Sequence, residues 1–288
     1  MLEATAPVMP IPPIVHQTWR AADIPKGLRG AVSSWRTMQP SWDYVFHSDS
    51  DNLKLLRTRY PWLLQIFSRM TPIQKADVAR YAYMHAYGGV YADLDVELLQ
   101  PLRPLLNRLQ SHRNVTVIIG QEPLAHSVLL ESKRRQACNA VLASVPGHPF
   151  WLAVLQHIGK QNRAGFDPVD STGPRMLERF ITSSWKGAGV HVAAPDVFFP
   201  TWDPMQAQTF RRRCRTIFSH GRVLSSAHTQ STSAQLDRIR RRVCKRLEKE
   251  KFHPTIDRAV AYTNHLWTHT WIPGAEKVSL RDTYRLQT

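Results

Sequence analysis

The chain has 288 residues, and 43% of them are hydrophobic, which suits a globular protein built on one large α/β domain. No run reaches the roughly 18 to 20 apolar residues that a membrane span needs. The first residues, MLEATAPVMPIPP, lack the basic segment and the apolar core of a signal peptide. We therefore expect a soluble chain whose proline-rich residues 1–12 are disordered.

The formal net charge is +16, and much of it lies in two segments, 211–215 and 238–251. Such clusters attract nucleic acid, an anionic membrane or a polyanionic substrate, and a solvated basic face without a partner is the alternative. Three cysteines, Cys138, Cys214 and Cys244, are too few and too irregularly spaced for a zinc site. A disulfide between Cys214 and Cys244 stays open, so cysteine content does not decide the compartment.

The first third of the chain alternates strands and helices. Residues 14–19 are predicted to form a strand ending in Trp19, a core residue or a platform for a nucleobase, and a helix at 27–38 and a strand at 42–47 follow. Asp49 and Asp51, in the next turn, are interpreted as helix caps. This alternation is typical of a nucleotide-binding α/β sheet, in which ligands bind at the carboxyl ends of the strands.

Residues 71–88 read as a buried helix with Thr71 as its N-cap and Gly88 at its end. The helix is apolar or aromatic almost all the way round, as expected of a helix inside the core. Asp77 and Arg80 interrupt this pattern and share one face. Because a buried charge must be paired or must hold a polar ligand, a mutual salt bridge and a ligand site both remain open.

The next segment, 90–98, is predicted to be a strand, because its apolar and polar residues alternate. Its polar face carries Tyr91, Asp93, Asp95 and Glu97. Two neighbouring carboxylates suit Mg²⁺ or Mn²⁺. The spacing alone is weak evidence, since chance supplies about one such pair in a protein of this size.

Later segments add further polar candidates. Strands at 115–120 and 136–144 present Glu122 and Asn139, and Glu122 is either an acceptor-side carboxylate or a structural cap or ion-pair partner. Asp170 precedes a helix that begins near residue 174, where an anion, a hydroxyl or a plain cap would fit. The segment 205–258 is expected to be an insertion containing one long amphipathic helix with a basic outer face, because its apolar residues follow helical spacing.

The order of Asp77, Arg80, Gly88, Gly89, Tyr91, Asp93 and Asp95 resembles the sugar-nucleotide-binding block of the DXD-motif glycosyltransferases. The resemblance is greatest to the glycosyltransferase family 32-like group, which contains the yeast Golgi α-1,6-mannosyltransferases and the mannosyl-inositol-phosphorylceramide synthase catalytic subunits. More distant relatives are the α-1,4-galactosyltransferases and the clostridial glucosylating toxins.

This resemblance implies a GT-A type fold, a Rossmann-like mixed sheet flanked by helices, over residues 13–288 as a single catalytic domain. It also implies transfer of a hexose from GDP-mannose or a UDP-sugar to a glycan or glycolipid, with Mn²⁺ or Mg²⁺ and with retention of configuration. Family members work in the Golgi. Since the chain shows no anchor, a cytoplasmic location is the alternative.

The resemblance also assigns roles to individual residues. In the family, the helix Asp and Arg contact the donor sugar, the acid pair binds the metal, and a C-terminal His and Trp lie over the diphosphate. No catalytic residue is identified, and Glu122, Asn139 and Asp170 are candidates. The implied donor-binding residues are Trp19, Asp77, Arg80, Tyr91, Asp93 and Trp271, and the implied metal ligands are Asp93, Asp95 and His265.

Two rival functions are compatible with parts of the chain. Paired aspartates also occur in metal-dependent phosphohydrolases, which need a further cluster of acids or histidines. The segment 205–258 could bind an anionic membrane or nucleic acid, and binding to nucleic acid should weaken steeply with salt. Neither rival accounts for Trp19, the block from Asp77 to Asp95 and the C-terminal residues together.

Overall fold

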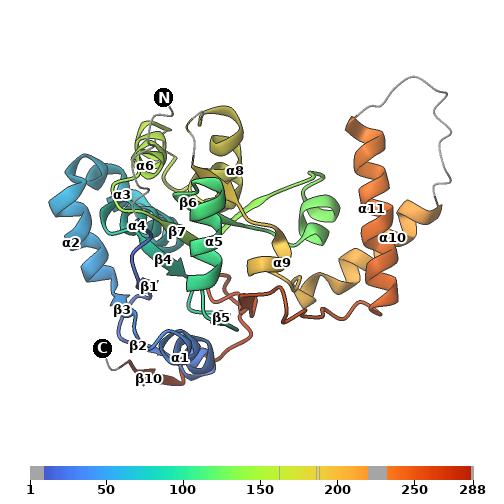
Figure 1. Cartoon of the computed structure of the whole chain (residues 1–288), viewed down its shortest axis with the longest axis horizontal. Coiled ribbons are helices and arrows are strands. Elements are labelled where there is room, and N and C mark those ends of the chain that lie inside the picture. Colours follow the sequence, from blue (N-terminus) through green and yellow to red (C-terminus); the bar gives the residue numbers. More distant parts are fainter. Residues whose placement is uncertain (1–9, 162, 186, 188, 220–231, 287–288) are drawn as a thin grey trace.

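The computed structural model describes residues 10–161, 163–185, 187, 189–219 and 232–286. A six-stranded sheet of order β3-β1-β4-β7-β6-β8 lies at its centre (Figure 1). Strand β7 runs antiparallel to both neighbours, and the other five strands run in one direction. The strands are β1 (Ile14–Thr18), β3 (Asp43–His47), β4 (Gly89–Ala92), β6 (Val117–Gln121), β7 (Ala137–Ser144) and β8 (Val190–Val192).

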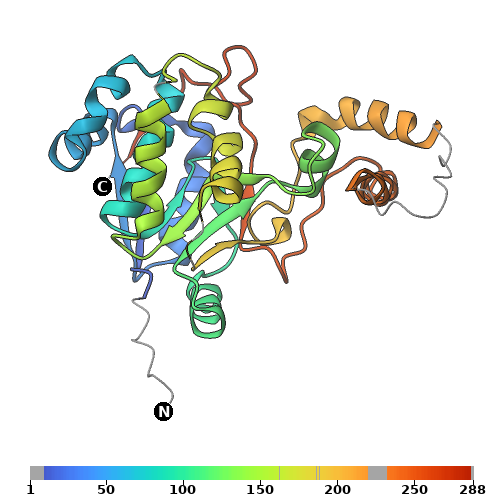
Figure 2. The ribbon, with the colours of Figure 1, turned by 90° about the horizontal axis from the view of Figure 1, so that it is seen from above.

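Helices cover both faces of this sheet, so the predicted α/β class, a mixed sheet flanked by helices, is confirmed (Figures 1 and 2). One face packs against α2 (Asp49–Arg59), α3 (Leu64–Arg69), α4 (Pro72–Ala86), α6 (Pro149–Gln161) and α8 (Pro174–Ser183). The other face packs against α1 (Arg29–Met38), α5 (Arg103–Arg113) and α9 (Pro195–Phe198). The short helix α7 (Pro168–Ser171) precedes α8.

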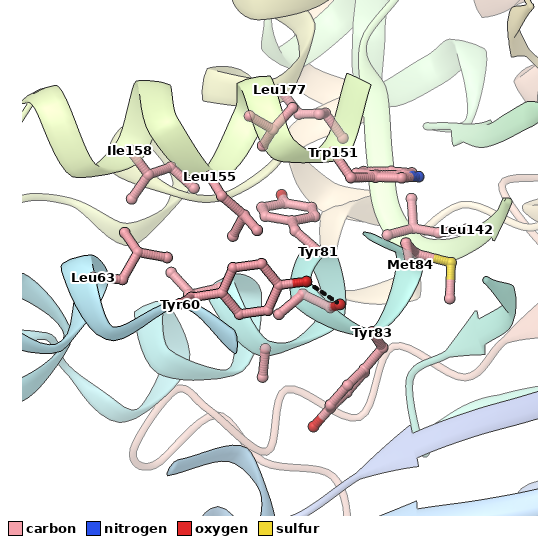
Figure 3. Packing of buried hydrophobic residues seen from close by; sticks show 14 of the residues in the cluster. Tyr60, Leu63, Tyr81, Tyr83, Met84, Leu142, Trp151, Leu155, Ile158 and Leu177 are labelled. Carbon is pink, nitrogen blue, oxygen red and sulfur yellow. Dashed lines mark hydrogen bonds between the residues drawn. The ribbon is translucent and has the colours of Figure 1, made fainter. Parts of the chain in front are cut away.

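Helix α4 lies inside the larger hydrophobic core, as the sequence predicts (Figure 3). Tyr81 stacks on Trp151 of α6 with 5.7 Å between ring centroids, and the Tyr60 hydroxyl donates to the carbonyl of Ala82 on α4. At the start of the helix, the Thr71 N–H donates to the Gln74 side chain at 3.0 Å. Beyond its end, Gly88 has φ 65°, the left-handed conformation that glycine adopts without strain.

Two small antiparallel sheets bring the end of the chain back to the first half. Strand β5 (Val96–Leu98) pairs with β9 (Thr263–His265), and β2 (Asp23–Pro25) pairs with β10 (Thr283–Arg285). The C-terminal segment therefore crosses beside the residues that join β4 to β5.

The N-terminal segment differs in part from the prediction. Residues 1–9 of the expected disordered segment lie outside the described residues. Ile11, however, is completely buried, its N–H donates to Gln110 and its carbonyl accepts from Arg103, so the prediction of disorder is wrong for this residue. An apolar side chain among prolines can still be a core residue when it meets a neighbouring helix.

The segment 205–258 contains two helices rather than the single one predicted. Helix α10 (Ala207–Ser219) and helix α11 (Thr232–Lys249) are joined by a disulfide between Cys214 and Cys244, and they extend away from the main sheet (Figures 1 and 2). They pack on a π-helical turn, η3 (His126–Leu130). Short 3₁₀ turns occur at Lys26–Leu28, Pro61–Leu63 and Pro204–Gln206. Among the helices of the described residues, none is both long and apolar enough to cross a membrane.

Candidate active site

A cavity of about 770 Å³ opens at one edge of the central sheet. The carboxyl ends of β1, β4 and β6 meet there, together with the amino end of the antiparallel strand β7. These strand ends deliver Trp19, Asp93, Glu122 and Asn139 to the cavity wall. The predicted position of a ligand site in a nucleotide-binding sheet therefore coincides with this cavity.

Helix α4 supplies the charged floor of the cavity through Asp77 and Arg80. The guanidinium of Arg80 lies 3.5 Å from Asp77 and 3.2 Å from Asp93, and it donates to the Asn139 carbonyl at 3.0 Å. Asp77 accepts from the Asn139 amide and from the Thr172 hydroxyl, both at 2.8 Å. The mutual salt bridge and the cavity-lining position, both left open by the sequence, thus occur together.

Burial controls the electrostatics of this pair. It raises the pKa of Asp77 to about 6, against the opposing effect of Arg80 and Thr172. Burial alone would lower the pKa of Arg80, but Asp93, Tyr91 and Asp77 outweigh it, so the guanidinium stays charged. A permanently charged guanidinium therefore faces the cavity beside a carboxyl group whose pKa lies above its usual range.

The prediction of one continuous strand over 90–98 is wrong. Strand β4 ends at Ala92, and β5 begins at Val96 in a different sheet. The Asp93 N–H donates to the Ala140 carbonyl and the Val96 N–H to the Asp93 carbonyl, which closes a turn around the buried Leu94. The chain changes sheets at this turn, because β5 has its partner in β9 and not in β7.

The two aspartates of this turn still converge, and they meet His265 from β9. One ligand atom from each of Asp93, Asp95 and His265 lies within 4.8 Å of the others. The Nε2 atom of His265 is 3.1 Å from Asp95, whereas its Nδ1 atom is buried without a hydrogen-bond partner among the described residues. Two carboxylates and an imidazole with an unused nitrogen fit Mn²⁺ or Mg²⁺.

The C-terminal segment is hydrogen-bonded to Asp95. The backbone N–H and the hydroxyl of Thr268 both donate to Asp95 Oδ2. Burial alone would raise the pKa of Asp95, but the bonds from His265 and Thr268 outweigh it and hold that pKa below its usual range. The same segment places Trp271, a residue that is 49% exposed, on the cavity wall.

Tyr91 and Trp19 complete the predicted donor side. The Tyr91 hydroxyl donates to Asp93, and the Arg80 guanidinium lies over the Tyr91 ring at 4.9 Å. Tyr91 therefore orients the Asp93 carboxylate. Trp19 lines the cavity, and its indole N–H is buried without a partner among the described residues.

The three catalytic candidates occupy different surroundings. Glu122 lines the cavity and accepts from His126 at 2.9 Å, while Asn139 lines it and holds Asp77. Asp170 is not among the cavity-lining residues and instead pairs with Arg175 and Arg179, at 3.1 and 2.6 Å. Glu122 and Asn139 therefore both lie at the cavity, whereas Asp170 lies outside it.

Sequence reasoning missed three polar residues that shape the site. Thr172 and Thr268 hold the two aspartates Asp77 and Asp95, a role that no local pattern in the sequence assigns to them. His126 holds Glu122, which lies outside the helical turn between β6 and η3, so no helical spacing in the sequence signals this contact.

Comparison with known proteins relates the chain to glycosyltransferases. The sequence model of the family described as "Glycosyltransferase sugar-binding region containing DXD motif" matches residues 25–116. Inositol phosphoceramide mannosyltransferase 2 of Schizosaccharomyces pombe is 32% identical over 181 residues, which are 61% of this chain and 47% of that protein. Mannosyl phosphorylinositol ceramide synthase SUR1 of Saccharomyces cerevisiae is 32% identical over 192 residues, 64% of this chain and 45% of that protein.

Among solved structures, PaToxG Glycosyltransferase aligns with a TM-score of 0.45 at 12% identity, over 88% of this chain and 89% of that one. The chain spans about half the length of the two curated yeast relatives. The chain is thus similar to the DXD-motif glycosyltransferases over residues 25–116, and to the yeast inositol phosphoceramide mannosyltransferases over about 60% of its length.

Proposed function

We propose that this chain transfers a hexose, with retention of configuration, from GDP-mannose or a UDP-sugar to a glycan or glycolipid acceptor. The observation that carries the proposal is the convergence of Asp77 and Arg80 with Asp93, Asp95 and His265 on one cavity. Residues 13–288 would form one GT-A catalytic domain with an insertion at 205–258. The names of the yeast relatives favour a mannosyl donor and a phosphoinositol-containing lipid acceptor.

Each group around the cavity has a role in this proposal. Asp77 and Arg80 would hold the hydroxyl groups of the donor sugar, because a charged hydrogen-bond pair on a buried floor recognises polar ligands. Trp19 would stack on the nucleobase, and Trp271 would cover the diphosphate. Mn²⁺ or Mg²⁺, held by Asp93, Asp95 and His265, would neutralise the charge that develops on the departing nucleotide diphosphate.

Glu122 is the proposed acceptor-side carboxylate. The Nε2 atom of His126 accepts the Asp203 N–H at 3.0 Å, so the proton of the neutral imidazole is on Nδ1, which donates to Glu122. This contact orients the carboxylate at the cavity wall, where it would accept a hydrogen bond from the incoming hydroxyl. His126 is then a positioning residue.

We also propose that the protein works in an oxidising compartment such as the Golgi lumen. The buried disulfide between Cys214 and Cys244 supports this location over the cytoplasm, since disulfides persist in oxidising compartments and are rare in the cytosol. The remaining cysteine, Cys138, is a buried free thiol.

A donor screen tests the proposed function. Purified protein with Mn²⁺ is given GDP-mannose, UDP-glucose, UDP-galactose or UDP-N-acetylglucosamine, and release of the nucleotide diphosphate is followed. One donor should be consumed, and Asp95→Asn should reduce that rate at least about 100-fold, as loss of a metal-neutralised leaving group demands. Undiminished turnover in Asp95→Asn contradicts the metal assignment.

Trp19→Ala tests the base-stacking role separately. We expect donor binding to weaken about 10-fold, the loss of one aromatic stacking contact, with an unchanged circular dichroism spectrum.

The metal-dependent phosphohydrolase remains the second candidate function. It is disfavoured because the described residues contain one group of three or more metal-ligating side chains, the set Asp93, Asp95 and His265.

A further inference from the structure

The hairpin of α10 and α11 carries a regular stripe of unpaired cations. Arg238, Arg242, Lys245 and Lys249 follow the spacing i, i+4, i+7 and i+11 on α11, so they fall within an arc of about 60° and extend over about 16 Å. All four side chains are exposed, and no ion pair or hydrogen bond to another described residue occupies them. The stripe is therefore available to an external partner.

The opposite face of the hairpin is occupied by its own core. Val243, Cys244 and Leu247 are buried against α10 and η3, and the disulfide fixes α11 to α10. Other cations of the hairpin have internal partners, as in the bond from Arg240 to the Val128 carbonyl at 3.1 Å. The stripe is thus the outward side of a cross-linked helix pair.

Helix α10 adds to the same kind of surface. Arg212 and Arg215 lie three positions apart on one face of α10, and both are exposed, with no ion pair or hydrogen bond from either guanidinium group to another described residue. The apolar side chains Phe210 and Cys214 point into the hairpin core from the other face. Six unpaired cations on a rigid pair of helices make a strong local positive potential.

We propose that this stripe docks the protein on an anionic lipid surface. Clusters of four to eight Lys and Arg on an amphipathic helix have this property, and each contributes about 1 kcal/mol of attraction. The choice of a membrane over a nucleic acid rests on the proposed function, because an enzyme acting on a glycolipid must meet its acceptor at a bilayer. The apolar residues of α11 are buried in the hairpin, so the contact is electrostatic and does not insert into the bilayer.

The hairpin also connects this surface to the cavity. Arg213 and Arg240 donate to the carbonyls of Leu129 and Val128 in η3, and η3 begins at His126, which holds Glu122. The docking stripe and the proposed acceptor-side carboxylate are therefore linked through one helical turn. Docking would therefore hold η3, and with it Glu122, at a fixed position relative to the lipid surface.

Vesicle sedimentation tests the proposal. The full chain is mixed with vesicles of phosphatidylserine in phosphatidylcholine, or of phosphatidylcholine alone, at low and at high salt. We expect binding to the anionic vesicles alone, weakened by salt. The fourfold variant Arg238→Gln, Arg242→Gln, Lys245→Gln and Lys249→Gln should lose at least about 100-fold in affinity.

A matched control changes the net charge equally and leaves the stripe intact. It carries Lys54→Gln, Arg69→Gln, Arg108→Gln and Lys160→Gln, four exposed cations on α2, α3, α5 and α6. This control should lose less than about 10-fold, because distant surface charges are screened. An equal loss in both variants, or binding to RNA in preference to anionic vesicles, overturns the proposal.

Donor hydrolysis without vesicles separates this proposal from the proposed function. Both fourfold variants should release nucleotide diphosphate from the donor at the wild-type rate, since none of the substituted residues lines the cavity. If the wild-type protein turns the donor over but binds anionic and neutral vesicles equally well, the docking surface alone is overturned. Absence of turnover in the wild-type protein overturns the transferase function, and the vesicle result then stands by itself.

Discussion

Thr268 donates two hydrogen bonds to one oxygen of Asp95, from its backbone N–H at 3.0 Å and from its hydroxyl at 2.8 Å. The two residues are 173 positions apart in the chain. Through this contact, the acid pair and the C-terminal segment behave as one unit. The position of Trp271 on the cavity wall therefore depends on Asp95.

The first prediction concerns Thr268→Val, which keeps the branched shape and removes the hydroxyl. Loss of a hydrogen bond to a charged acceptor costs about 1.5–3 kcal/mol, so affinity for the nucleotide diphosphate with Mn²⁺ should fall at least about 10-fold. Isothermal titration calorimetry measures this. Thr268→Ser, which keeps the hydroxyl, should bind almost normally, and equal affinities in the two variants would refute the coupling.

The sequence predicts the central sheet well, for a physical reason. The strands at β1, β3, β6 and β7 and the buried helix α4 each combine an unambiguous hydrophobic pattern with a clear start or stop signal, such as Thr71 and Gly88. The carboxyl-end rule then places Trp19, Asp93 and Glu122 together without any knowledge of distances. These local signals agree with the global fold.

The parts that the sequence predicts poorly depend on distant partners. The alternation of residues 90–98 fits a strand, but the pairing of β5 with β9 breaks it at Leu94, and no local pattern contains that information. The contact from Thr172 to Asp77 spans 95 positions. Helix α10 is not recognised in the sequence, because its run of arginines interrupts the helical pattern of the few apolar residues that face α11.

The second prediction concerns Asp77→Asn. This change removes the carboxylate that partly neutralises the buried Arg80, and breaking a buried pair from one side costs about 3 kcal/mol. The free energy of unfolding from urea titration should fall by about that amount, and donor binding should fall as well. Thr172→Ser, which keeps the hydroxyl that donates to Asp77, should cost less than about 1 kcal/mol. An Asp77→Asn variant with an unchanged free energy of unfolding would contradict the claim that Asp77 stabilises the fold by pairing with Arg80.

The third prediction concerns the disulfide of the hairpin. Denatured protein should show one reactive thiol before reduction, from Cys138, and three after it. The double variant Cys214→Ser and Cys244→Ser releases a loop closed across 30 positions, so the hairpin should lose about 3–4 kcal/mol of stability. Hydrogen exchange should show this loss in α10 and α11 and leave α4 protected. Three reactive thiols before reduction would rule out the disulfide and its implication for the compartment.

The fourth prediction concerns pH and the pair His16 and His47. The Gly88 carbonyl accepts from Nε2 of His16, so Nδ1 of His16 accepts from Nε2 of His47, and both imidazoles are neutral. Burial is the main cause that lowers the pKa of His16 to about 3 and that of His47 to about 4, from an ordinary value of 6.5. The unfolded chain thus binds more protons than the folded one between pH 4 and 6.5.

The sign of the effect follows from this difference in bound protons. The stability that the neutral histidine pair contributes is fully present above pH 6.5 and is lost as the pH drops toward 4. The slope is up to about 1.4 kcal/mol per pH unit for each histidine. Urea titrations across this range measure the slope. His16→Gln removes one titrating group and retains an amide donor for the Gly88 carbonyl, so it should reduce the slope by about half. A wild-type stability that stays constant between pH 6.5 and 4 would show that the pair is protonated in the folded protein.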